Sequence, residues 1–226
     1  MKVLFPFVGD SVGGSHWSAV NLYKELNANS DITPVIVLHT LDGQLSKFFD
    51  DYHIPYKFLP LLSLAGTKPS FISIVFSVIC SSYSIFRFIR NNDIDIVHGN
   101  DLRINLTWSL PTQLARAKYV WHQRQRLSRS KKWYAIRYFS NYVISISNFV
   151  HQSLPVNIKT NYKACISNPF NVTNLYDKKL SRSKINSSYN IPSSHILIGY
   201  VGRLVSWKHV EDILYALSIV ISLDKS

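Results

Sequence analysis

Residues 198–214, IGYVGRLVSWKHVEDIL, have the pattern of a strand, a glycine loop and a helix. A short apolar, β-rich run ends at Gly202, and two cations, Arg203 and Lys208, follow it. The next apolar residues recur at helical spacing: Val210, Ile213, Leu214, Leu217 and Ile221. A strand, a glycine loop with cations and a helix form an arrangement that binds phosphate, because loop N–H groups and the positive helix end face the anion. From spacing alone, a plain strand–helix turn with solvated cations is the alternative.

Composition describes a globular, basic chain. Of its 226 residues, 46% are hydrophobic, and 13 tyrosines, 12 phenylalanines and 5 tryptophans argue against disorder. The net charge of +12 implies an anionic partner or surface. Much of the charge is local, because residues 81–140 hold eleven cations and three acidic residues. Cys80 and Cys165 match no metal or redox spacing, which favours a reducing compartment.

Apolar runs alternate with helical patterns along most of the chain. The predicted strands are residues 1–8, 33–38, 56–59, 94–99, 118–122, 142–146 and 163–166. The main helical patterns between them are residues 45–52, 71–89, 104–115 with Pro111 interrupting, 132–139 and 148–154. The opening residues are too short for a cleavable signal. This alternation predicts an α/β fold whose mostly parallel sheet is covered on both faces and binds ligands at the carboxyl ends of its strands.

The run 71–89 is long and apolar enough to suggest a membrane span. It carries serines at three- and four-residue steps, which gives one helical face a semi-polar stripe. We therefore expect a helix buried against the sheet. Peripheral attachment to a membrane, through this helix or the basic stretch, stays open.

Polar residues and glycines follow several predicted strands. Gly13 and Gly14 follow the first strand, His98 and Asn100 come at the end of another, and His122 and Arg124 at the end of the next. Parallel strands bring such ends to one edge of the sheet, where a histidine can hydrogen-bond a sugar hydroxyl. The alternatives are a bare glycine turn, since the spacing is not G-x-G-x-x-G, and structural histidines with satisfied hydrogen bonds.

The composition changes after residue 170. Residues 1–170 form the predicted N-terminal Rossmann-like domain, 171–194 a polar linker, and 195–226 the start of a second domain. A lone strand and helix cannot bury their own apolar faces, so we expect the chain to be a fragment.

The N-terminal pieces resemble family 4 glycosyltransferases, the group-1 retaining enzymes. Residues 13–26 are similar to the glycine loop and first helix of that family, and residues 95–100 to a later strand. Residues 142–150 resemble the family's V-I-A-V-S strand and helix. Residues 165–171 resemble its I-P-N-G-V-D motif, with Pro169 in place of the glycine.

The most specific part of the resemblance lies near the carboxyl terminus. Residues 201–204 with Lys208 are similar to the family's G-R-L…K-G motif, with His209 in place of the second glycine. The family also carries an E-x7-E acidic motif about a hundred residues further on, which this chain does not reach. We therefore expect the 226-residue chain alone to transfer no sugar.

The resemblance implies a GT-B enzyme: an α/β protein with a Rossmann-like N-terminal domain, the first βα unit of a second Rossmann-like domain, and an active site between the domains. Such enzymes move a sugar from a nucleotide diphosphate sugar to an acceptor with retained configuration. They need no metal or other cofactor, because preorganised cations stabilise the leaving diphosphate.

The resemblance also implies residue roles. Arg203 and Lys208 would clamp the diphosphate, Gly13 and Gly14 would let donor phosphate or acceptor approach the backbone, and His122 would lie near the transferred sugar. The predicted catalytic residues are His122, Arg203 and Lys208, and the predicted substrate-binding residues are Gly13, Gly14, His98, Asn100, Arg124 and Gly202.

The expected partners are a nucleotide sugar donor, a glycan, lipid-linked glycan or polysaccharide precursor as acceptor, and a peripheral membrane surface. We expect no specific nucleic acid and a cytoplasmic location, on the inner face of the membrane if attached. Three alternatives remain: a non-catalytic GT-B-like subunit, a basic module that binds anions or nucleic acid, and a GT-B-fold sugar epimerase. Nucleic-acid binding would weaken steeply with salt.

Overall fold

The computed structural model describes residues 1–9, 12–61, 71–127, 136–158, 160, 162–169, 176–202, 204 and 206–223. The chain divides into two compact units, Met1–Phe170 and Asn171–Ser226. Each is described by itself.

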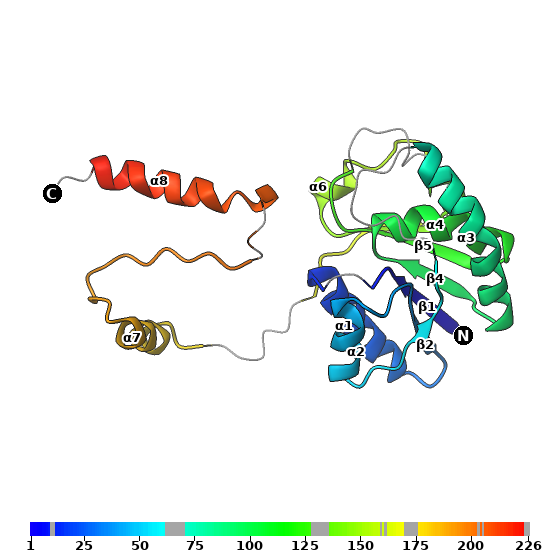
Figure 1. Ribbon diagram of the computed structural model, residues 1–226, viewed down its shortest axis with the longest axis horizontal. Coiled ribbons are helices and arrows are strands. Elements are labelled where there is room, and N and C mark those ends of the chain that lie inside the picture. Colours follow the sequence, from blue (N-terminus) through cyan, green and yellow to red (C-terminus); the bar gives the residue numbers. More distant parts are fainter. Residues whose placement is uncertain are drawn as a thin grey trace. The chain divides into compact units, whose positions relative to one another are not determined.

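The first unit alternates strands with helices (Figure 1). Its strands are β1 (Lys2–Phe7), β2 (Thr33–Leu38), β3 (Lys57–Phe58), β4 (Ile96–Gly99), β5 (Lys118–Gln123), β6 (Tyr142–Ser145) and β7 (Tyr162–Cys165). Its helices are α1 (Gly14–Asn27), α2 (Gln44–Asp51), α3 (Phe71–Asn91), α4 (Leu102–Leu114), α5 (Ile136–Phe139) and α6 (Asn148–His151).

The strands of the described residues form one sheet in the order β3-β2-β1-β4-β5-β6-β7, and every pair is parallel. The chain first builds outward from β1 to β3 and then returns to place β4 on the other side of β1. In sheets of this kind, ligands bind beyond the carboxyl ends of the strands at the point where the order reverses. That point lies here between β1 and β4.

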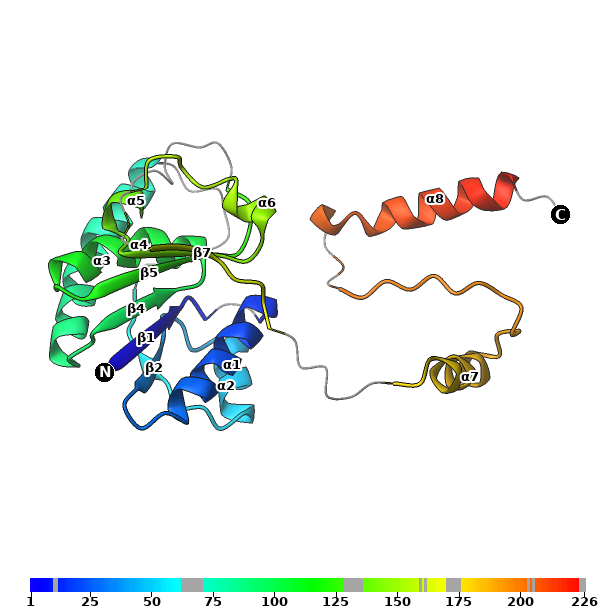
Figure 2. The ribbon, with the colours of Figure 1, turned by 180° about the vertical axis from the view of Figure 1, so that it is seen from behind.

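Alternate residues of the strands face two separate hydrophobic clusters. Val3, Phe5 and Phe7 of β1 pack with residues of α1 and α2, whereas Leu4 packs in the cluster that contains residues of α3, α4 and α5. Figures 1 and 2 accordingly show α1 and α2 on one face of the sheet and α3 and α4 on the other. The predicted α/β fold with a sheet covered on both faces is therefore confirmed.

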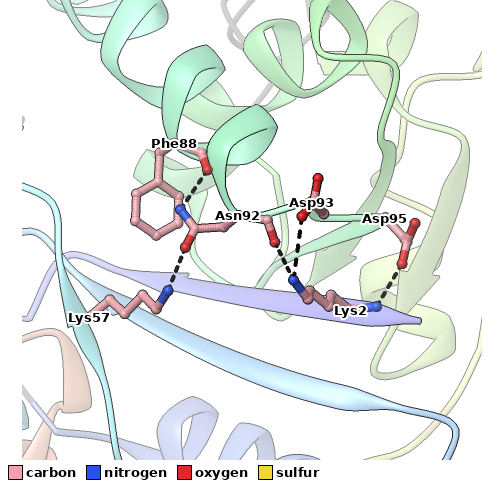
Figure 3. Close-up of polar contacts among 6 residues, drawn as sticks. All are labelled: Lys2, Lys57, Phe88, Asn92, Asp93 and Asp95. Atoms are coloured by element: carbon pink, nitrogen blue, oxygen red, sulfur yellow. Dashed lines mark hydrogen bonds and ion pairs between the residues drawn. The ribbon is translucent and has the colours of Figure 1, made fainter.

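A polar network ties the amino ends of the strands to the end of α3 (Figure 3). The backbone N–H of Lys2 donates to Asp95 Oδ2 at 2.7 Å, and Lys2 Nζ donates to the carbonyl of Asn92 at 2.9 Å and lies 3.8 Å from Asp93 Oδ2. The side chain of Asn92 donates to the carbonyl of Phe88 at 2.8 Å and accepts from Lys57 Nζ. These bonds hold the carboxyl end of α3 against β1 and β3.

Helix α3 is only partly buried, which corrects the expectation of a helix buried against the sheet. Ser81, Ile85 and Ile89 are buried, but Ile72 and Phe76 on another face are exposed. No helix in the described part of the chain is long and apolar enough to cross a membrane.

Helix α4 also differs from the prediction, because Pro111 does not interrupt it. The helix runs from Leu102 to Leu114, and the carbonyl of Pro111 accepts a hydrogen bond from the N–H of Ala115. Pro111 and its neighbour Thr112 are buried, so packing against the rest of the unit holds the helix across the proline.

The second unit contains α7 (Lys178–Tyr189), a short 3₁₀ helix (Ser206–Lys208) and α8 (Val210–Leu223). Helix α7 lies inside the stretch that was predicted as a linker. It begins after Asp177, whose side chain accepts from the N–H of Leu180 at 2.8 Å, and ends at Asn190 in the left-handed region. Neither α7 nor α8 buries a residue.

The apolar run before Gly202, residues 196–201, has the sequence pattern of a strand but is not a strand in this structure. A strand needs a neighbouring strand to pair its N–H and C=O groups, and the described part of the second unit contains none. Ile196 and Val201 are accordingly exposed.

Candidate functional site

The carboxyl ends of β4 and β5 bring His98 and His122 together. In the register of these strands His98 faces Val120, so His122 lies two residues further along on the same face of the sheet. His98 Nε2 is 3.1 Å from His122 Nδ1, and the two rings are stacked with centroids 5.3 Å apart. On the other side of His98, the ring of Phe5 in β1 lies 5.2 Å away. A histidine pair therefore lies beside the point where the strand order reverses.

Both histidines are neutral at physiological pH. Burial, and secondarily the charge of Arg124, lowers the pKa of His98 to about 3. Burial, then Arg124 and His98, lowers the pKa of His122 to about 2. Each ring thus carries one proton, and one of these protons forms the bond between the rings.

The second nitrogen of His122 is the most informative atom of the site. His122 Nε2 is buried and has no hydrogen-bond partner among the residues that the structure describes. A buried polar nitrogen without a partner costs free energy, about 1–3 kcal/mol for a typical group. A bound water or a polar group of a ligand would satisfy such an atom, so His122 Nε2 is a candidate contact for a ligand.

Arg124 forms a second cluster at the same edge. Its Nε and Nη2 atoms donate to Asn100 Oδ1 at 3.1 and 2.8 Å, and its Nη1 atom donates to Asn168 Oδ1 at 2.8 Å. Asn100 in turn donates to the carbonyl of His98 at 3.2 Å. Burial lowers the pKa of Arg124 to about 10, so the guanidinium stays charged at neutral pH. Two amides thus hold a half-buried cation next to the histidine pair.

Gly13 and Gly14 lie at the beginning of α1, which follows β1. The N–H of Gly13 donates to His16 Nδ1 at 3.0 Å, and the N–H of His16 donates to the carbonyl of Gly13 at 2.9 Å. A Cβ atom would meet nothing within 4 Å at Gly14 and only His16 Nδ1, at 3.9 Å, at Gly13. Packing within the protein does not require glycine at these positions.

Two other glycines are required by packing. A Cβ atom at Gly99, the last residue of β4, would overlap the hydroxyl of Tyr119, which is fully buried. Gly9 has a φ of 98° and lies against the carbonyl of Thr40, so it also needs to be glycine. Neither glycine is among the predicted site residues.

The remaining predicted site residues belong to the second unit. A Cβ atom at Gly202 would lie 2.6 Å from the hydroxyl of Tyr200. Lys208 is exposed at the end of the 3₁₀ helix, and Arg203 lies outside the described residues. His209, at the position of the second glycine in the G-R-L…K-G motif that residues 201–208 resemble, has a φ of 52°, a conformation that glycine adopts more easily. The roles of Gly202, Arg203 and Lys208 stay predictions.

Structure reveals two further polar residues. Asn168 follows β7 within the motif-like residues 165–171 and is not among the predicted site residues, although its amide at a strand end is a recognisable signal. His39 follows β2 and accepts from Trp108 Nε1 at 2.9 Å through Nε2, so its proton is on Nδ1, 2.9 Å from the carbonyl of Leu59. Because both nitrogens of His39 are paired, this half-buried histidine links β2, α4 and the end of β3.

No group of three or more His, Cys, Asp or Glu residues in the described ranges is arranged to hold a metal ion.

Comparisons with known proteins identify the fold. No protein-family model matches the chain, and no curated protein sequence matches it. The HepE structure from Anabaena, in complex with UDP, matches 96% of this chain with a TM-score of 0.68 at 18% identity. A glycosyltransferase from Rickettsia africae matches 97% of the chain with a TM-score of 0.68 at 23% identity. A UDP-N-acetylglucosamine 2-epimerase matches 68% with a TM-score of 0.52 at 15% identity.

These matches establish that the chain has the α/β fold of GT-B glycosyltransferases, with a Rossmann-like parallel sheet. HepE was also solved with UDP-glucose. The chain spans 57% of the length of HepE and of the rickettsial enzyme.

Proposed function

We propose that this chain is the acceptor-side part, with the beginning of the donor-side part, of a retaining glycosyltransferase that uses a nucleotide diphosphate sugar. The observation that carries the proposal is the buried His122 Nε2, which has no partner among the described residues, at the carboxyl end of β5 together with the held Arg124. The fold supports it, because structures that share this fold were solved with UDP and UDP-glucose. A UDP-sugar is therefore the first donor to test.

His122 is proposed to contact the transferred sugar. A neutral imidazole either donates a hydrogen bond to a sugar hydroxyl or accepts one from it. The hydrogen bond to His98 determines the role of His122 Nε2: this atom donates if the bridging proton belongs to His98, and it accepts if that proton belongs to His122. Hydrogen-bonding to the sugar would give the buried Nε2 atom its partner.

Arg203 and Lys208 are proposed to clamp the diphosphate. Negative charge grows on the leaving diphosphate as the glycosidic bond breaks, and preorganised cations stabilise that charge most in the transition state. These cations would take the place of a metal ion. Gly13 and Gly14 support an approach of donor phosphate or acceptor to the backbone of α1, since a Cβ atom there would meet little of the protein.

The proposed domains are 1–170 on the acceptor side, a linker at 171–194, and 195–226 at the start of the nucleotide-sugar domain. The proposed acceptor is a glycan, a lipid-linked glycan or a polysaccharide precursor, and the proposed place of action is the cytoplasm, at the inner face of the membrane.

Variants of the full natural-length protein test the assignment. We expect His122→Ala, Arg203→Ala and Lys208→Ala each to lower kcat/KM for sugar transfer by roughly 10²-fold or more, the usual scale for loss of a transition-state contact. Lys184→Ala, which removes an exposed cation of α7, is the matched control and should keep wild-type turnover. Near wild-type rates in all three site variants would contradict the proposal.

A sugar epimerase is the second candidate, because one such enzyme shares the fold. The two activities are separated by incubation with a UDP-sugar and no acceptor, followed by NMR of the nucleotide sugar. A transferase leaves the sugar configuration unchanged, whereas an epimerase produces a second nucleotide sugar.

A further inference from the structure

One face of α3 is apolar and exposed to water. Ile72, Phe76, Ile79 and Tyr83 are 63–78% exposed, and Val75 is 39% exposed. Their spacing of three and four residues places them on a single face of the helix. Large apolar residues gathered on one face, rather than scattered singly, indicate a surface that contacts something other than water.

The rest of α3 is firmly held, so this face has a defined position on the first unit. Ile85 and Ile89 are buried in the same hydrophobic cluster as Trp108 of α4. The network around Asn92 then ties the end of the helix to β1 and β3 (Figure 3).

The polarity of the exposed face changes in order along the helix. Apolar residues occupy its first turns, Tyr83 follows, and Arg87 and Arg90 continue the same helical spacing. The guanidinium of Arg87 lies over the ring of Tyr83, 5.7 Å from its centroid. The whole helix sequence contains no acidic residue.

This order matches the polarity of a lipid bilayer surface. Apolar side chains enter the boundary of the acyl chains, tyrosine prefers the level of the headgroups, and arginine binds lipid phosphates. An anionic leaflet adds attraction for the two arginines and for a chain of net charge +12. A second copy fits less well: an antiparallel pair would place Arg87 and Arg90 of one copy against the apolar turns of the other, and a parallel pair would bring arginine against arginine.

We propose that the exposed face of α3 docks the protein on the surface of an anionic phospholipid bilayer. Ile72, Phe76 and Ile79 enter the interface, and Arg87 and Arg90 lie at the phosphates. The helix is inclined, with its amino-terminal turns deepest in the interface, and it does not cross the bilayer. The inference deepens the proposed function by naming the surface that would attach the protein to the membrane. Its test measures lipid binding alone, so the result does not depend on sugar transfer.

Vesicle co-sedimentation tests the proposal with the 226-residue chain. We expect binding to vesicles of phosphatidylcholine and phosphatidylglycerol in equal parts, and at least tenfold weaker partitioning for the Phe76→Ser/Ile79→Ser variant. Phe149→Ser is the matched control, because Phe149 of α6 is 62% exposed and Phe76 is 63% exposed. The control should partition within about twofold of the wild type.

Two double variants, one on α3 and one on α7, test the contribution of Arg87 and Arg90 to vesicle binding. Arg87→Gln/Arg90→Gln should weaken binding to the anionic vesicles by about fivefold for each residue. Lys179→Gln/Lys184→Gln removes the same charge from exposed positions of α7 and should change binding much less. Equal losses in both variants would mean general charge attraction and would overturn the proposal.

The two native cysteines provide a test that keeps the apolar and basic side chains of the face unsubstituted. Both Cys80 of α3 and Cys165 of β7 are exposed. An environment-sensitive fluorophore on Cys80, in a Cys165→Ser background, should shift to the blue when anionic vesicles are added, whereas the same label on Cys165 should not. An unchanged Cys80 signal would refute docking on lipid. The same conclusion would follow if the protein self-associated and the Phe76→Ser/Ile79→Ser variant lost this self-association but still bound vesicles.

Discussion

At the scale of single residues, the site depends on keeping two histidines neutral and one arginine charged. Burial disfavours the charged form of every group, but it acts on groups whose ordinary pKa values differ by many units. The pKa of His98 falls to about 3, well below physiological pH, while that of Arg124 falls only to about 10. The same environment therefore yields a hydrogen-bonding imidazole beside a fixed cation.

The buried histidines predict acid sensitivity. Burial lowers the folded-state pKa of His39 to about 4, of His98 to about 3 and of His122 to about 2, whereas the unfolded value is about 6.5. Between the folded and unfolded pKa values the unfolded chain binds more protons than the folded chain. The stability that the three neutral histidines contribute is therefore fully present above about pH 6.5 and is lost as the pH falls toward 4. Each histidine contributes a slope of up to about 1.4 kcal/mol per pH unit.

Urea unfolding at pH 8, 7, 6 and 5 measures this slope. The variant His98→Asn, which removes one titrating ring, should show a shallower decline below pH 6.5 and a curve parallel to the wild type above pH 7. An equally steep decline in the variant would mean that His98 is not held neutral by the fold.

At the scale of elements, the polar network at the amino ends of the strands fixes α3. The side chain of Asn92 bonds to Phe88 within the helix and to Lys57 of β3, and its backbone carbonyl accepts from Lys2 of β1 (Figure 3). One asparagine thereby positions a helix of 21 residues on the sheet. This attachment sets the orientation of the exposed face of α3 on the first unit.

Removal of the Asn92 side chain should therefore destabilise the first unit. We expect Asn92→Ala to lower the free energy of unfolding by roughly 1–2 kcal/mol, because two side-chain hydrogen bonds are lost while the carbonyl bond to Lys2 remains. The adjacent, exposed Asn91 supplies the matched control, and Asn91→Ala should be nearly neutral. Equal effects of the two substitutions in urea unfolding would rule out the network as the cause.

At the scale of the whole molecule, stability is concentrated in the first unit. Both hydrophobic clusters lie entirely within Met1–Phe170. Helices α7 and α8 bury no residue, and α8 exposes large apolar side chains such as Leu214 and Ile221. The second unit thus contributes little of the apolar burial that stabilises the chain.

A shortened chain of residues 1–170 should consequently fold by itself. We expect its Tm to lie within about 3 °C of the full chain, since a change of less than about 1 kcal/mol shifts the Tm of a protein of this size by only a few degrees. Thermal unfolding followed by circular dichroism checks this. A drop of 10 °C or more would show that the second unit stabilises the first.

Much of the fold is visible in the sequence because its signals are local. Residues 33–38 were predicted as a strand and are β2, and the predicted strands at 118–122 and 142–146 are β5 and β6 with shifts of one residue. Burial on both faces makes such strands continuous apolar runs. The helix α7 was missed, although Asp177 and Asn190 mark its two ends, because its polar composition is typical of a linker.

Part of the site was also predictable. The strand ends pointed to His98, Asn100, His122 and Arg124, and the structure brings these four together. Asn168 was not assigned a role, because its hydrogen bond to Arg124 joins residues 44 positions apart. No local pattern reports a contact at that separation.

The sequence by itself determined the α/β class, the succession of strands and helices, and the residues at the strand ends. These features are visible because the spacing of apolar residues and the positions of turn residues are signals that extend over only a few neighbouring residues. The tertiary structure decided which strand ends meet, which His122 nitrogen lacks a partner and which face of α3 meets water. It also decided that residues 196–201 do not form a strand. Each of these depends on atoms brought together from distant parts of the chain, and pairing between distant backbones has no signature in a single segment.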